Sequence, residues 1–303
     1  MRQNVLSTIF LFFLLSGCTP ILDNATTSTS TIEDTAQQVG DVMASIDEVG
    51  GSTGNLANYQ KDFDRMYAEY VPSSKYEKIF DYLSPNSVAA SCNTGTFSSC
   101  TGGNTITRTF SGCSVGSATF NGTVTLLWGG ASSNCSMGSQ GDTITRTPNF
   151  TMTGRRNATL YVTKPPSSTG QVLTWISGSA SATRTYSYAN GGINRKFVLN
   201  STSLFDQTTS TTTPLTITSS LRLNRVLNGG TLRVVNNLTS NVCTFSPNNV
   251  TWTSSTCNCP TQGSWTGSCT STGSITLEIT GCGSAKYTEG NDTTTVTFDR
   301  CGT

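Results

Sequence analysis

The first part of the chain has apolar residues at helical spacing. From residue 32 onward, residues that suit a helix face recur in alternating steps of three and four: Ile32, Thr35, Val39, Val42, Ile46 and Val49. This spacing predicts a helix that buries one face. Thr31 followed by Asp34 indicates its N-terminal cap, and Gly50-Gly51 ends it.

Two further helices are predicted before the pattern changes, one over Leu56–Val71 and one over 74–83. The seam is shorter than three full heptads, so it does not establish a coiled coil. We expect residues 31–85 to form a small helical subdomain that packs on itself or on the rest of the protein. A trimeric stalk is the alternative.

From residue 86 the chain is rich in Ser, Thr, Asn and Gly and alternates with period two. One stretch places Phe120, Gly122, Val124 and Leu126 on one face and Thr119, Asn121, Thr123 and Thr125 on the other. One dry and one wet face are typical of antiparallel sheet. The prediction is a mainly β protein, in which residues 86–303 form an antiparallel β-meander of roughly ten to twelve strands. It would close as an open barrel or fold as an elongated sandwich, preceded by the helical segment.

A repeat of 38 residues runs through this region. Thr-Ile-Thr-Arg-Thr occurs around Arg108 and again around Arg146, Thr-Arg-Thr returns around Arg184, and Arg222 follows at the same offset. Each arginine precedes a turn signal by six to eight residues, namely Gly116, Gly154, 190–192 and 228–230. We interpret the unit as a β-hairpin with a long connection, copied about four times.

The N-terminus carries an export signal. Arg2 is followed by a short apolar stretch, and Leu15-Ser16-Gly17-Cys18 resembles the lipobox of bacterial lipoproteins. The resemblance implies that residues 1–17 are a signal peptide and that Cys18 becomes the acylated N-terminus. Thr19 after the cysteine then implies the outer membrane, with the protein facing the periplasm or the cell surface. Residues 18–30 are expected to be the lipidated cysteine and a flexible tether.

Ten of the eleven cysteines remain once Cys18 is set aside, which fits five disulfides in an oxidising compartment. Short loops between strand ends suggest the pairs Cys92–Cys100, Cys113–Cys135, Cys243–Cys257, Cys259–Cys269 and Cys282–Cys301. The chain has no histidine, so a zinc site is disfavoured and we expect no metal and no cofactor.

The same lack of histidine excludes Ser-His-Asp and Cys-His catalysis. A glycosidase would need two facing carboxylates, for which Glu278 and Asp292 are the candidates. Glu278 is flanked by Leu277 and Ile279, so we expect it to face solvent. We therefore predict that the protein is not an enzyme and has no catalytic residues.

Charge divides the chain into two parts. Residues 19–85 hold four basic and eleven acidic side chains, and residues 86–303 hold thirteen basic and six acidic ones. Either the acidic helices dock on basic positions of the sheet, or Arg108, Arg146, Arg184 and Arg222 form a ladder that binds an anionic glycan or lipopolysaccharide. The basic residues are too dispersed for a nucleic-acid partner. We expect Trp128, Trp175, Trp252 and Trp265 to pack in the core.

Lipobox and composition together resemble the Ser/Thr-rich, disulfide-bearing lipoproteins of diderm bacteria, a resemblance that implies a location and no activity. The sequence thus predicts a non-enzymatic, membrane-anchored envelope or surface lipoprotein that presents a β-rich module for adhesion or envelope interaction. The alternative is a periplasmic carrier that holds a lipid or other apolar ligand in a curved sheet. Its groove would be lined by Phe120, Val124, Leu126, Phe150 and Tyr161.

Overall fold

The structure is a computed structural model of the chain. It describes residues 27–49, 56–70, 96–97, 103–115, 118–130, 135, 139–165, 170–177, 183–189, 191–219 and 222–301. The predicted signal peptide, the lipobox with Cys18, most of the tether, the third helix, and Cys92 and Cys100 lie outside these residues.

Two helices precede the sheet, as predicted. Helix α1 spans Thr27–Val49 and helix α2 spans Leu56–Tyr70. The predicted start of α1 at Thr31 was wrong by one turn, because the preceding run of threonine and serine continues the helix. Neither helix in the described part of the chain is long and apolar enough to cross a membrane.

The remainder is mainly β, and each pair of neighbouring strands is antiparallel, which confirms the predicted fold class. The described residues form seventeen strands and one 3-10 turn, η2 (Arg155–Asn157). The strands are β1 (Thr96–Phe97), β2 (Thr105–Val115), β3 (Ala118–Gly129), β4 (Thr143–Thr153), β5 (Thr159–Thr163), β6 (Gly170–Trp175), β7 (Arg184–Ala189), β8 (Ile193–Leu199), β9 (Thr202–Thr213), β10 (Leu215–Thr218), β11 (Arg225–Asn228), β12 (Thr231–Asn236), β13 (Val242–Trp252), β14 (Gln262–Cys269), β15 (Gly273–Gly281), β16 (Ser284–Glu289) and β17 (Asp292–Thr297).

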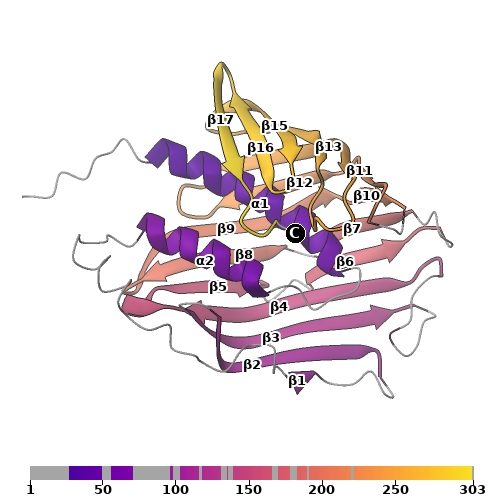
Figure 1. Ribbon diagram of the computed structural model, residues 1–303, viewed down its shortest axis with the longest axis horizontal. Helices are drawn as coiled ribbons and strands as arrows, with labels where there is room; N and C mark the ends of the chain where they lie inside the picture. Colours follow the sequence, from indigo (N-terminus) through magenta and orange to yellow (C-terminus); the bar gives the residue numbers. More distant parts are fainter. Residues whose placement is uncertain are drawn as a thin grey trace, which may run out of the picture.

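The strands follow one another as a meander with a divided middle (Figure 1). β1 to β4 pair in order, and β4 then pairs with both β5 and β6. One branch continues through β8, β9 and β12 and the other through β7, β10 and β11. Both branches meet again on β13, and β14 to β17 complete the sheet.

The division is a crease across the sheet. The pairs β5 and β6, β7 and β8, β9 and β10, and β11 and β12 each run in one direction along a single line, interrupted by a few residues. Gly192 and Gly230 lie in two of these breaks, at φ +83° and +80°. A Cβ at Gly192 would collide with the carbonyl oxygen of Thr209, and one at Gly230 with that of Pro214. Such breaks bend a strand.

Two of the four predicted hairpins are confirmed, and the other two predictions were wrong. The hairpins of β2 with β3 and of β4 with β5 are present. The turns predicted at 190–192 and 228–230 are instead kinks, because β7 does not pair with β8 nor β11 with β12 in the described register. Glycine pairs with positive φ suit both a tight hairpin and a bulge, so the sequence signal is the same for both.

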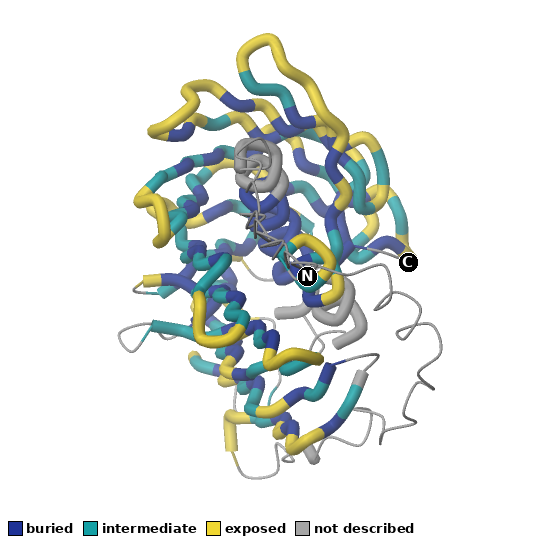
Figure 2. The backbone as a smooth tube through the Cα atoms, turned by 90° about the vertical axis from the view of Figure 1, so that its left-hand side faces the viewer, coloured by how far each residue is buried: buried dark blue, intermediate teal, exposed yellow. Residues whose placement is uncertain are grey.

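The curled sheet encloses α1, which Figure 2 shows near its centre. Every residue from Asp34 to Ile46 is buried, on all sides of the helix. Apolar residues of α1, including Val39, Val42 and Met43, belong to the same hydrophobic core as the strands. Among the described strands, β1 and β17 each pair on one side and not with each other, so the single sheet is an open, curved meander.

Helix α2 covers a neighbouring part of the concave face. The ring of Phe63 lies 6.0 Å from that of Phe197 on β8, and the ring of Tyr70 lies 5.9 Å from it. Within the sheet, Phe110, Phe120 and Phe150 form a cluster of rings about 6 Å apart. The four tryptophans are buried, which confirms the expectation that they pack in the core.

The disulfides contradict three predicted pairs. Cys243 bonds Cys269, Cys257 bonds Cys282, and Cys259 bonds Cys301, so the pairs Cys243–Cys257, Cys259–Cys269 and Cys282–Cys301 were wrong. The prediction favoured short loops, whereas strand register decides: Cys243 on β13 lies directly opposite Cys269 on β14. Cys113 and Cys135 are each disulfide-bonded, and the identity of their partners stays a prediction.

Gly40 of α1 packs against Phe298, in the segment after β17. A Cβ there would lie 2.6 Å from Cδ1 of Phe298 and 2.8 Å from its Cγ. We expect Gly40→Val to lower the free energy of unfolding by about 1–3 kcal/mol, because the core has no room for the added atoms. Urea denaturation measures the change.

A double-mutant cycle with Phe298→Ala tests the cause. Removing the ring creates space, so Gly40→Val should cost less in that background. Additive effects of the two substitutions would show that the clash with Phe298 is not the reason.

Candidate functional site

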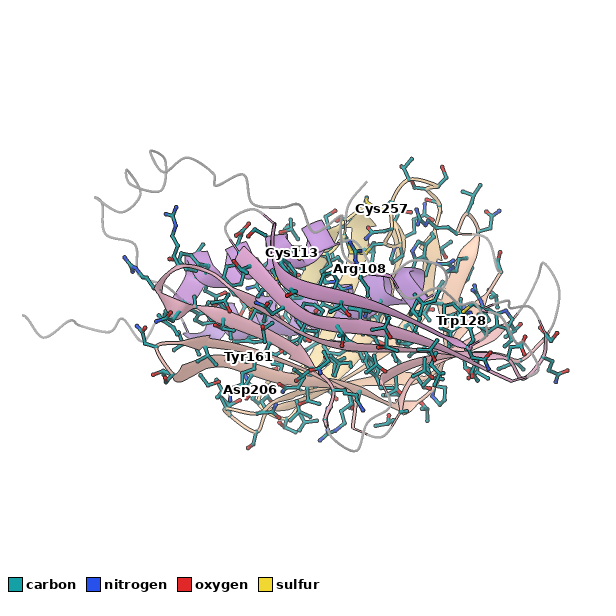
Figure 3. All side chains as sticks on the ribbon, turned by 90° about the horizontal axis from the view of Figure 1, so that it is seen from below. Arg108, Cys113, Trp128, Tyr161, Asp206 and Cys257 are labelled. Carbon is teal, nitrogen blue, oxygen red and sulfur yellow. A yellow bond between two sulfur atoms is a disulfide. The ribbon has the colours of Figure 1, made fainter. Side chains whose placement is uncertain are left out.

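The arginines predicted to bind an external anion are mostly buried. Arg108, Arg146 and Arg184 have 8%, 0% and 4% of their surface exposed. Arg108 lies on the concave face of the sheet, the side of the helices, whereas Tyr161 and Asp206 lie on the opposite face (Figure 3). The alternating burial of β4 and β7 puts Arg146 and Arg184 on the buried face as well. A polymeric glycan or lipopolysaccharide on the outside would not reach these three guanidinium groups.

These arginines also fail to line up as a ladder. Arg108 is opposite Val124, which is opposite Pro148, so Arg108 is displaced from Arg146 along the strands. Arg184 is opposite Trp175, further along in the same sense. Equal sequence spacing therefore does not give equal register, because bulges and turns of different length separate the strands.

Arg222 lies outside the strands, in the connection between β10 and β11, and donates a hydrogen bond to the carbonyl oxygen of Ser255 at 3.0 Å. The arginine that faces the core in this copy is Arg225, which stacks 5.5 Å from the ring of Trp252. Arg184 stacks on Trp175 in the same way, at 5.7 Å. Burial and the like charge of Arg225 lower the pKa of Arg184 to about 10.

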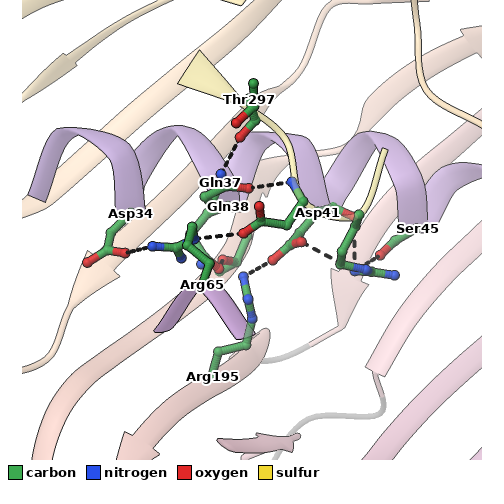
Figure 4. A network of polar contacts seen from close by, with 11 residues as sticks. Asp34, Gln37, Gln38, Asp41, Ser45, Arg65, Arg195 and Thr297 are labelled. Atoms are coloured by element: carbon green, nitrogen blue, oxygen red, sulfur yellow. Dashed lines mark hydrogen bonds and ion pairs between the residues drawn. The ribbon is translucent and has the colours of Figure 1, made fainter. Parts of the chain in front are cut away.

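The buried charges of α1 pair with the sheet, which confirms that the acidic helix docks on basic strand positions. Asp41 forms an ion pair with Arg195 on β8 and another with Arg300 after β17, the latter at 3.7 Å (Figure 4). Arg300 also donates to the hydroxyl of Ser45 at 3.2 Å. Burial and the like charge of Arg300 lower the pKa of Arg195 to about 9.

A second cluster lies two turns earlier on α1. Arg65 of α2 bonds Asp34 at 3.1 Å and Asp299 at 2.7 Å, and the hydroxyl of Tyr70 donates to Asp34 at 2.8 Å. Burial raises the pKa of Asp34 despite these partners. Gln37 joins α1 to the end of β17 through the carbonyl oxygen of Thr297 and the amide of Asp299. The two clusters therefore hold helix, sheet and C-terminal segment together.

The candidate carboxylates for hydrolysis do not form a site. Glu278 is exposed on β15, as expected, with Lys286 as its cross-strand neighbour, and Asp292 is exposed at the start of β17. No group of three or more metal-ligating acidic or cysteine side chains occurs within the described residues. The groove residues of the carrier alternative, Phe120, Val124, Leu126 and Phe150, are packed in the core, and Tyr161 faces outward.

An open pocket of about 550 Å³ lies at one end of the sheet, beside α1. Two turns form its walls, the β12–β13 turn with Thr239, Ser240 and Asn241, and the β14–β15 turn with Thr270, Ser271 and Thr272. Thr35 of α1, Cys269, and Tyr287 and Glu289 of β16 complete it. Its volume is typical of small-molecule sites.

Hydrogen bonds fix the two turns against each other. The side-chain oxygen of Asn241 accepts from the hydroxyl of Thr270 at 2.7 Å and from the backbone amide of Ser271 at 3.1 Å. The Thr270 hydroxyl in turn accepts from the amide of Val242 at 3.1 Å. The Cys243–Cys269 disulfide joins the same strands at this end. The pocket is therefore preformed.

Most of the surface of the pocket is apolar, and the polar groups that its described residues add are hydroxyls, one amide and one carboxylate. Tyr287 donates to Glu289 at 3.3 Å, and burial together with the charge of Glu289 raises the pKa of Tyr287, so its phenol stays protonated. Among the described residues, no basic side chain and no second carboxylate line the pocket. The described lining residues do not provide the paired carboxylates that glycoside hydrolysis needs.

Burial of Asp34 predicts a pH dependence. Burial raises the pKa of Asp34 in the folded state above its usual value of 3.8. At a pH between the unfolded-state and the folded-state pKa, the folded chain therefore binds more protons than the unfolded chain. The stability of the wild type relative to Asp34→Asn should therefore fall as the pH rises from 3.5 to 7. Denaturation across this range measures it, with Asp292→Asn as an exposed control; a rise instead would mean that Arg65 and Tyr70 outweigh the burial.

Comparisons with known proteins give no match to this chain: no family model, no curated protein and no solved structure is similar to it. The candidate site is therefore assigned from its geometry alone.

Proposed function

We propose that the chain is a non-enzymatic, membrane-anchored envelope or surface lipoprotein whose curved sheet binds a neutral glycan in the pocket between the β12–β13 and β14–β15 turns. The observation that carries this proposal is the lining of that pocket. Five residues with hydroxyl groups, one amide and one carboxylate stand on a largely apolar surface: Thr239, Ser240, Thr270, Ser271 and Thr272 with Asn241 and Glu289.

Polyhydroxylated ligands match this lining. A hydroxyl can both donate and accept a hydrogen bond, and those of Ser240, Ser271 and Thr272 are the ones offered to a ligand. The Thr270 hydroxyl and the Asn241 oxygen are already bonded within the two turns and hold them in place. Of the described lining residues, Glu289 alone is a carboxylate and none is basic, so a neutral glycan is favoured over an acidic one. The proposed binding surface is therefore the pocket and not the repeated arginines.

Adhesion or envelope interaction fits such a site. The pocket is at the rim of the sheet, where the turn residues are exposed, so an extended glycan could pass over it. A rigid core and the disulfides among the last strands hold the rim in place.

The carrier is the alternative function. An apolar ligand would have to enter the concave face, which α1 and α2 occupy. Carrying would therefore require α1 to leave the sheet and to expose Asp34 and Asp41 together with their arginine partners.

Ser271→Trp tests the glycan pocket. Ser271 is exposed, and its backbone amide rather than its hydroxyl bonds Asn241, so the substitution fills the pocket without breaking that bond. We expect the wild type to bind neutral glycans on an array, and the variant to bind the same glycans at least about tenfold more weakly. Thr212→Trp, at an exposed site on β9 away from the pocket, is the matched control and should bind normally.

Two outcomes would contradict the proposal. Selective binding of sulfated or sialylated glycans would favour an anion site elsewhere. Binding of neutral glycans that Ser271→Trp leaves unchanged would move the site away from the pocket.

Replacing the predicted lipidation site tests the anchor. Cys18→Ser should prevent acylation and shift the protein from the membrane to the soluble fraction, which fractionation and intact-mass measurement detect. Retention of an acyl mass by the variant would exclude Cys18 as the anchor. The same unanchored protein serves the carrier alternative, because native mass spectrometry would reveal a co-purified lipid.

A further inference from the structure

The pocket between the β12–β13 and β14–β15 turns has a mostly apolar surface, although residues with hydroxyl groups make up much of its lining. Four of the described lining residues are threonines, each of which adds a methyl group beside its hydroxyl: Thr35, Thr239, Thr270 and Thr272. A ligand made of hydroxyl groups alone would leave this apolar surface without a counterpart. We therefore expect the ligand to carry apolar substituents of its own.

The carboxylate of Glu289 is the second feature of the pocket that limits the ligand. Glu289 is half-buried at the end of β16, and its Oε2 accepts a hydrogen bond from the hydroxyl of Tyr287 at 3.3 Å. In the part of the chain that the structure describes, the side chain of Glu289 has no other hydrogen bond or ion pair. An ionised carboxylate only accepts hydrogen bonds, so Oε1 is left for a donor on the ligand.

A sugar hydroxyl and an amide N–H could both donate to this oxygen, but they differ in what else they bring to the pocket. A hydroxyl keeps its own capacity to accept, and placing that oxygen on an apolar surface without a donor costs free energy. An amide N–H has no such capacity. In an acetamido group the amide also ends in a methyl, which the apolar surface can remove from water.

The hydroxyl groups of the two turns provide for the remaining atom of an acetamido group, its carbonyl oxygen. This oxygen needs a donor, and Ser240, Ser271 and Thr272 line the pocket with hydroxyls that can donate. The N–H, the carbonyl oxygen and the methyl of one acetamido group thus each have a counterpart in the described lining.

We propose that the ligand of this pocket is a neutral glycan that contains N-acetylated amino sugars. The amide N–H of the sugar donates to Oε1 of Glu289, and its methyl group contacts the apolar surface. This inference rests on the proposed function and names the class of sugar that the same pocket selects. Sugars with hydroxyl groups only offer the donor without the methyl, and deoxy sugars offer the methyl without the amide.

Two tetrasaccharides with the same backbone test this preference. The β1,4-linked tetramers of N-acetylglucosamine and of glucose differ only in the substituent at the second carbon of each ring, and titration calorimetry with the unanchored Cys18→Ser protein measures the affinity for both. We expect the acetylated tetramer to bind at least about tenfold more tightly, because it adds a hydrogen bond to a charged group.

The outcomes separate this inference from the proposed function. Equal affinity for the two tetramers, or a preference for the glucose tetramer, would overturn the inference and leave the glycan pocket in place. If neither tetramer binds while non-acetylated neutral glycans on the array do, the class of sugar is wrong. If no neutral glycan binds, the proposed function fails as well.

Glu289→Gln tests whether the carboxylate makes the selection. Glutamine keeps the size of the side chain and can still accept from Tyr287, but its Nε2 then presents a donor where the carboxylate presented an acceptor. A sugar hydroxyl can turn to accept from this nitrogen, whereas an amide N–H cannot. The variant should therefore lose about tenfold in affinity for the acetylated tetramer and stay within about threefold of the wild type for the glucose tetramer. A loss that is equal for both would overturn the assignment of Glu289.

Glu278→Gln is the matched control. Glu278 is exposed on β15 and is not among the described residues that line the pocket. This variant removes the same charge from the protein and should keep the wild-type affinity for both tetramers. If it loses the preference for the acetylated tetramer, the preference comes from the overall charge, and the role of Glu289 is refuted.

Discussion

A helix buried on every side must find a partner for each of its polar groups, and the rest of this structure depends on that constraint. Asp34, Gln37, Gln38, Asp41 and Ser45 of α1 are all buried. Their partners come from α2, from the middle of the sheet and from the segment after β17. Removing water from these groups is costly unless hydrogen bonds and ion pairs replace it. The curl of the sheet round α1 brings these partners together.

Much of the fold follows from local pattern. The alternation in Phe120, Val124 and Leu126 predicts β3 and its buried face, and the helical seam predicts α1. The kinks at Gly192 and Gly230 could not be told from hairpin turns, because the choice depends on which strand lies alongside. The predicted disulfide pairs were wrong for the same reason. Cys243 bonds Cys269 because the register of β13 and β14 places the two opposite each other, and the length of the loop between them does not indicate this register.

The sites were harder to predict than the fold. The segregation of acidic and basic residues correctly indicated that the helix docks on the sheet, but Asp41, Arg195 and Arg300 are far apart in sequence and carried no individual signal. The repeated arginines did carry a signal, and it pointed to architecture: Arg108, Arg146 and Arg184 are buried. The candidate pocket lies where two turns and one helix converge. Each turn alone is ordinary Ser/Thr/Asn sequence and does not indicate a site.

The bonds between α1 and the C-terminal segment have a consequence for the order of folding. Gln37 and Asp41 bond residues about 260 positions later, at Thr297, Asp299 and Arg300. Contacts this distant in sequence form slowly, and α1 cannot complete its set of partners until the whole sheet has been assembled around it. Cys259–Cys301 closes next to this point. The last few residues of the chain are thus what secures the first helix, and a protein shortened before Arg300 would leave Asp41 without one of its two arginines at the centre of its core.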